Sequence, residues 1–99
     1  MAINSLVKNV TTAGTAERIS ATSIYVSTVT FRASKGNTND IYIGDSGVGN
    51  SYPDLDANQT ITFEAPTIAG NVEGIDLKSV WVDSDTDGEG VDVWYNDLG

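Results

Sequence analysis

The residues with the clearest capacity for chemistry lie in the run DSDTDGEG, residues 83–90. Asp83, Asp85 and Asp87 alternate ahead of a glycine. Calcium takes about six to eight oxygen ligands, and alternate carboxylates before a glycine turn are typical of its loops. The helix–loop–helix form of this site is excluded, because Trp94 occupies the position that needs a bidentate Glu and the flanking segments have β character.

A calcium site in a loop between two strands therefore remains, with Asp92 as a further ligand. The alternative is a solvated turn, because Asp and Gly are residues that turns favour. Calcium is the one cofactor that the sequence suggests.

Other catalytic chemistry is poorly supported. The chain has no histidine and no cysteine, which excludes a Ser-His-Asp triad, a Cys-His pair and a His or Cys zinc site. Acidic pairs such as Asp54 with Asp56 are present, but nothing in the sequence distinguishes one pair from the others. The run GDSGVG, residues 44–49, lacks the Lys and the helix of a phosphate-binding loop. We therefore expect a protein that is not an enzyme.

The charge balance limits the partners. The formal net charge is -9, from 14 acidic and 5 basic residues. Such a surface repels phosphate backbones and anionic membranes, so we expect neither nucleic acid nor membrane as a partner. A basic protein surface or a cation suits it better. No apolar run is long enough for a signal peptide or a membrane helix.

Short β-branched runs punctuated by Gly, Asn and Asp predict an all-β protein. The pattern predicts a single-domain β-sandwich or jelly-roll-like barrel of about seven short antiparallel strands over residues 15–99, after a flexible N-terminal arm over residues 1–14. A change of inward parity near Ser27 and Thr28 predicts either a β-bulge in the strand over residues 23–34 or a strand shared between two sheets. Asn58 is expected to adopt the left-handed conformation in a turn.

The last two strands, residues 75–83 and 91–95, are expected to form a hairpin closed by the acidic loop. Pairing Val82 with Val93 on the core face would set Trp81 opposite Trp94, both outward. It would also set Asp83 opposite Asp92, and like charges in that position are unfavourable. A cation, a nearby Lys or Arg, or a register shift of one residue would relieve them.

Aromatic side chains on the outer faces predict an interface, because Trp and Tyr are frequent interface anchors. Trp81, Trp94, Tyr42 and Tyr52 are the candidates. The same rings could instead form a platform on which sugars stack.

The runs TVTFRA, IYIGDS, TITFEA, IDLKSVWV and VDVWY, in this order between about residues 15 and 96, resemble small all-β virion proteins of tailed bacteriophages. Several members of that group decorate or cement the capsid. The resemblance implies a non-enzymatic head decoration (cement) protein. It implies that the protein binds the major capsid protein on the outer capsid surface as a homotrimer, after synthesis in the bacterial host cytoplasm. The alternatives are a carbohydrate-binding or receptor-binding module and a tail or neck structural protein.

Overall fold

The computed structural model describes residues 2–49, 52–68, 70–72 and 74–98 of the chain. Almost all regular structure in these residues is β. The elements are β1 (Ala2–Asn9), β2 (Glu17–Arg18), β3 (Tyr25–Ala33), β4 (Ile41–Gly44), β5 (Asp54–Leu55), β6 (Thr60–Glu64), β7 (Thr67–Ile68), β8 (Asn71–Val72), β9 (Ile75–Asp76), the 3-10 turn η1 (Leu77–Ser79), β10 (Trp81–Ser84) and β11 (Gly90–Asp97). Among the described residues, no helix is long and apolar enough to cross a membrane.

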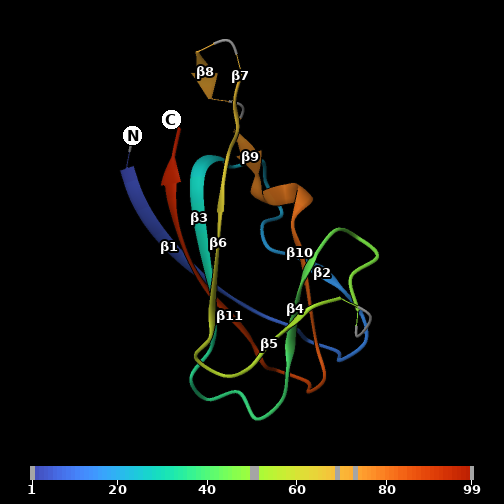
Figure 1. The fold of residues 1–99 in the computed structure, drawn as a ribbon. Helices are drawn as coiled ribbons and strands as arrows, with labels where there is room; N and C mark the ends of the chain where they lie inside the picture. The colour runs from blue at the N-terminus through green and yellow to red at the C-terminus, as the bar shows by residue number, and fades with distance from the viewer. Residues whose placement is uncertain (1, 50–51, 69, 73, 99) are drawn as a thin grey trace.

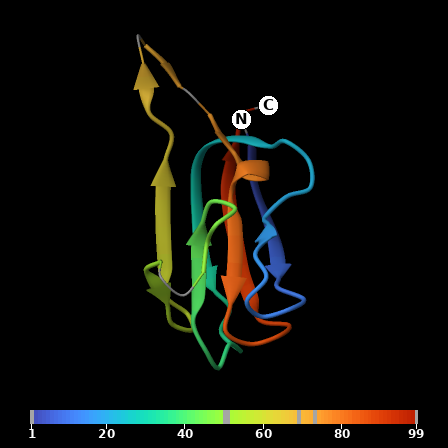
Figure 2. The ribbon, with the colours of Figure 1, turned by 90° about the vertical axis from the view of Figure 1, so that its right-hand side faces the viewer.

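Two antiparallel sheets face each other (Figures 1 and 2). The larger sheet has the order β1-β11-β3-β6, with β9 also paired to β3, and the smaller sheet has the order β2-β10-β4-β5. A separate two-stranded hairpin, β7–β8, extends beyond both sheets. The all-β, two-sheet prediction is confirmed. The barrel alternative is wrong for the part of the chain described, because neither sheet closes on itself.

The core lies between the two sheets and follows the alternation of the central strands. Val29, Phe31 and Ala33 of β3 are buried on one face, as their alternation predicts, and Thr30 and Arg32 lie on the other face. Ile41 and Val82 of the smaller sheet and Leu77 of η1 contribute to the same core cluster. This packing fixes which side chains of each central strand point outward.

The predicted hairpin of the last two strands is wrong. β10 pairs with β2 and β4, whereas β11 pairs with β1 and β3. The acidic loop therefore crosses from the smaller sheet to the larger one. Val82 and Val93 are both fully buried, as expected, but they belong to opposite sheets that enclose the same core.

The N-terminal segment is not an unpaired arm. β1 pairs with β11 along its whole length, from Ala2 opposite Asp97 to Asn9 opposite Gly90. Val10 follows and is fully buried, and its N–H donates to the Glu89 carbonyl at 2.9 Å. The first strand is therefore an edge of the larger sheet.

Two local predictions are confirmed. The register between β3 and β11 shifts so that Asn96 faces Thr28 while Asp97 faces Val26, which leaves Ser27 as the extra residue of a bulge. Asn58 has a φ of 70°, the left-handed conformation expected from its place in a turn.

Candidate functional site

The acidic loop is held by hydrogen bonds to the protein itself. Asp83 is 4% exposed, and its Oδ1 accepts from the N–H groups of Gly14 at 3.0 Å and Ser84 at 2.8 Å. Asp85 accepts from the Tyr42 hydroxyl at 2.9 Å. Asp87 belongs to the same stretch of carboxylates and accepts from the Ala13 N–H at 2.7 Å. The loop thus fastens the segment after β1 to the end of β10.

Asp92, the fourth predicted calcium ligand, lies in the larger sheet. The Arg32 guanidinium donates to its Oδ2 at 2.7 and 3.1 Å, and the Ser34 hydroxyl donates to its Oδ1 at 3.0 Å. The like-charge pair expected between Asp83 and Asp92 does not arise, because Asp83 faces Tyr42 and Asp92 faces Arg32. An arginine was among the expected ways to balance Asp92.

A pocket of about 440 Å³ borders the acidic loop and includes Asp83, Ser84 and Asp85 in its lining. Asp83, Asp85, Asp87 and Asp92 do not form a set of three or more ligand oxygens within 4.8 Å of one another. Calcium at these residues stays a prediction, tested by a thermal melt with calcium and with a chelator.

The structure instead brings together Asp40, Asp54 and Asp56, whose carboxylate oxygens lie within 4.8 Å of one another. Asp40 precedes β4, and the other two lie at β5 and just after it. A side-chain hydrogen bond with Asp56, burial and the neighbouring negative charges raise the pKa of Asp40 to about 6. Below about pH 6 this cluster therefore retains a proton that Asp residues of the unfolded chain release near pH 4.

The raised pKa gives the first testable prediction. Asp40 binds its proton more tightly in the folded protein than in the unfolded chain, and this difference stabilises the fold. The stabilisation is fully present below the pKa of Asp40 in the unfolded chain, and it is lost as the pH rises through about 6. At pH 7.5, Asp56→Asn replaces a charge repulsion with an amide donor, and we expect its melting temperature to exceed that of the wild type by a few degrees. At pH 4.5 the difference should shrink.

Glu64→Gln is the matched control, because it removes one exposed negative charge outside the cluster, and all melts are made at low protein concentration to limit self-association. Elsewhere Glu17, Asp45 and Asp76 have lowered pKa values, mainly because their carboxylates accept hydrogen bonds, and these acids lose stabilisation as the pH falls. Comparing each variant with the wild type at each pH cancels that contribution. An equal shift at both pH values, or for both variants, would contradict the proton-sharing account.

The outer face of the larger sheet carries Trp94, which is 39% exposed and points away from the core. On β1, Ile3 and Val7 are 81% and 64% exposed, and they pair with Asn96 and Asp92 on either side of Trp94. We call these residues, with their β3 and β11 neighbours, the Trp94 face: Ile3, Ser5, Val7, Thr28, Thr30, Arg32, Asp92, Trp94 and Asn96.

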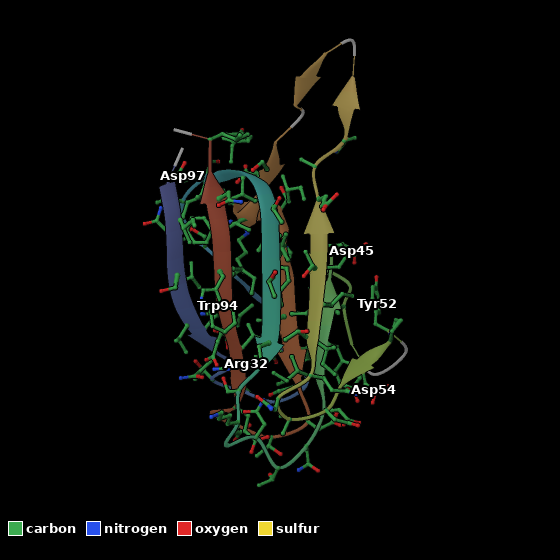
Figure 3. The ribbon with its side chains drawn as sticks, turned by 60° about the vertical axis from the view of Figure 1, so that its left-hand side comes forward. Arg32, Asp45, Tyr52, Asp54, Trp94 and Asp97 are labelled. Carbon is green, nitrogen blue, oxygen red and sulfur yellow. The ribbon has the colours of Figure 1, made fainter. Side chains whose placement is uncertain are left out.

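Arg32 organises this face. Its guanidinium carbon lies 5.0 Å from the centre of the Trp94 ring (Figure 3). Its nitrogens bond Asp92. The cation thus stacks on the ring and balances the one carboxylate on this face. Two hollows, of about 190 and 470 Å³, both include Trp94 in their lining. The result is a nearly neutral surface with exposed apolar groups on a strongly acidic molecule.

Trp81 does not share this surface. It lies on β10 of the smaller sheet, beside the core residue Val82, so it points away from the larger sheet. The Arg18 guanidinium carbon lies 5.1 Å from its ring centre, and the ring borders a separate hollow of about 440 Å³. Both tryptophans point outward as expected, but they lie on opposite faces of the molecule.

The two candidate tyrosines have packing and hydrogen-bonding roles. Tyr42, expected to point outward, is only 6% exposed. Burial and the Asp85 carboxylate raise the pKa of Tyr42 to about 12. Tyr52 is partly buried beside Gly44, and its hydroxyl donates to Asp45 at 2.7 Å (Figure 3). The four aromatic residues therefore do not form one platform.

The partners of Trp94 were not identified from the sequence. Ile3 and Val7 each have one apolar neighbour in the sequence, so the strand alternation around them is weak, and nothing local indicates that they lie beside β11. Comparison with family models, curated proteins and solved structures finds no match to this chain.

Proposed function

We propose that this protein is a non-enzymatic structural component of a tailed-bacteriophage virion. It binds the major capsid protein on the outer capsid surface as a decoration (cement) protein and stabilises the head. The Trp94 face carries this proposal. It exposes an aromatic ring and two aliphatic side chains, and its arginine and aspartate balance each other. A surface that is apolar at its centre and depleted of net charge is typical of protein interfaces.

The mechanism is burial of this face across a joint between capsid subunits. Trp94 lies on a strand paired on both sides, and Arg32 already stacks on its ring, so little side-chain freedom is lost on docking. A ring of this kind commonly contributes about 2 kcal/mol or more to binding, about 30-fold in affinity. Docked across a joint, such contacts would resist separation of the subunits.

The jelly-roll-like strand connections that the resemblance implies are a further part of this proposal. The trimer that it implies is the alternative to the two-fold dimer proposed below. A tail or neck position would use the same adhesive face. A sugar-binding role would place a glycan over Trp94, in the hollow that also includes Thr28, Thr30 and Asn96. The binding experiment below distinguishes these roles.

We expect Trp94→Ala to weaken binding to capsid shells at least about 30-fold in a cosedimentation titration. Trp81→Ala is the matched control, because it removes the same kind of ring from the opposite face. We expect its affinity for capsid shells to stay within about threefold of the wild-type value. Thermal melts of both variants verify that each is folded.

Three outcomes would overturn the proposal. One is full binding by Trp94→Ala. Another is absence of wild-type binding to shells together with binding to tails or necks. The third is binding to a glycan array that is lost in Trp94→Ala, together with no binding of the wild type to capsid shells.

A further inference from the structure

The strand β6 forms an unprotected edge of the larger sheet. It pairs with β3 on one side and ends the sheet order on the other, and all five of its residues are exposed. Edge strands offer unpaired N–H and C=O groups, and natural proteins usually protect them with charges, proline or bulges. β6 contains no proline, its five pairs with β3 are in regular register, and its one charge is Glu64 at the end.

An apolar groove runs beside this edge. Ile61 and Phe63 pair with Phe31 and Val29, so they lie on the core side of the sheet, yet they are 37% and 40% exposed. The groove measures about 260 Å³ and is mostly apolar; its lining is Val29, Phe31, Ile43, Gly44, Phe63, Glu64, Ile75 and Val80. The core is therefore incompletely covered where β6 ends the sheet.

Charge indicates the kind of partner that fits. Between Asp56 and Glu73 the sequence has one charged residue, Glu64, although the whole chain carries a net charge of -9. A basic partner would be attracted to the acidic parts of the surface. A second, equally acidic copy is repelled least along a stretch that is nearly free of charge. The β6 edge is such a stretch.

We propose that β6 pairs antiparallel with β6 of a second copy, about a two-fold axis at Thr62. This register sets Thr60 opposite Glu64 and Ile61 opposite Phe63, and each pair occurs twice. The two glutamates stay apart, and the apolar pairs meet on the groove side, where cross-strand contacts between aromatic and β-branched residues stabilise sheets. The two larger sheets become one continuous sheet, and both β6 edges become paired.

The β7–β8 hairpin supports the same arrangement. It follows β6 and extends beyond the rest of the molecule (Figures 1 and 2), and its strands have two residues each. An isolated two-stranded hairpin is marginally stable in water. Antiparallel pairing of β6 directs each hairpin past the turn at Asn58 of the second copy, where it gains a surface to pack against.

This interface adjoins the Trp94 face, because the Thr62 and Thr30 hydroxyls lie 2.8 Å apart, but it does not depend on capsid binding. Its symmetry is two-fold, whereas the resemblance to decoration proteins implies a trimer. Molar mass in solution distinguishes the two states.

Because the chain has no cysteine, single cysteines test the register directly. Thr62→Cys sets two thiols opposite each other across the axis, at a separation close to disulfide geometry. We expect it to form a disulfide-linked dimer on mild oxidation, at least about tenfold faster than Ser5→Cys on the opposite edge strand β1. A mixture of Thr60→Cys and Glu64→Cys should link to each other faster than either variant links to itself.

Light scattering gives the second measurement. The wild type should show a dimer mass at high concentration, and Thr62→Lys should raise the dimer dissociation constant at least about tenfold, because two lysines would face each other. Ser5→Lys adds the same charge and should leave the dimer intact. A wild-type monomer or trimer throughout the concentration range would overturn the proposal. Equal cross-linking of Thr62→Cys and Ser5→Cys would also overturn it.

Discussion

Gly90→Ala is expected to lower the free energy of unfolding by about 3 kcal/mol or more. Gly90 begins β11 and pairs with Asn9 of β1. A Cβ at this position would fall on the Lys8 carbonyl oxygen and lie 2.6 Å from the Asn9 Cα. These are backbone atoms, so no side-chain rotation relieves the overlap. The end of β1 must separate from β11, and the pairing and burial around Val10 are lost with it.

Urea unfolding measures this effect. Gly36→Ala is the matched control, since an added Cβ there meets no heavy atom within 4 Å and the change should stay within about 0.5 kcal/mol. Because β1 carries Ile3 and Val7, the Gly90 variant should also bind shells less tightly. Equal stability of the two variants would show that β1 is not packed against β11 at this point, as an unpaired N-terminal arm would require.

The elements predicted well from the sequence are those whose environment is set by their own alternation. β3 is central and has one face in the core, so Val29, Phe31 and Ala33 reveal their orientation directly. The bulge at Ser27 is visible because it reverses the parity of that pattern. Asn58 is predictable because few residues adopt its conformation readily.

Other features depend on which strands become neighbours, and strand neighbours cannot be predicted from the local sequence. A turn such as residues 85–89 can close a hairpin or cross between sheets with the same residues. β1 is an edge strand with several polar residues on both faces, so its alternation is weak although its pairing is complete. Tyr42 follows the expected alternation of β4, but Asp85 and its surroundings cover it.

In the candidate sites, too, some features follow from local alternation and others follow only from strand pairing. Trp94 is predictable as an outward ring because Val93 beside it belongs to the core. Its stacking with Arg32 joins positions 62 residues apart and arises only from the pairing of β3 with β11. The carboxylates of Asp40, Asp54 and Asp56 also come together through the pairing of β4 with β5, so a regular spacing in the sequence does not reveal them.

The second large effect is expected for Phe31→Ala. Phe31 and Phe63 form an edge-to-face pair with ring centres 5.9 Å apart, and both lie on the core side of the larger sheet. Their exposures differ: Phe31 is fully buried and Phe63 is 40% exposed. Removing the buried ring should cost about 3–5 kcal/mol, a large part of the roughly 5–15 kcal/mol that stabilises a domain.

Phe63→Ala is the control for this comparison, and its cost at low protein concentration should be about 1 kcal/mol, because much of that ring already contacts water. Denaturant unfolding of the two variants gives both values. A similar cost for both rings would mean that the smaller sheet covers β6 as fully as it covers β3. The groove would then be closed, and Phe63 would have no apolar surface left to offer a second copy. A clear difference leaves that surface available, as the two-fold pairing of β6 requires.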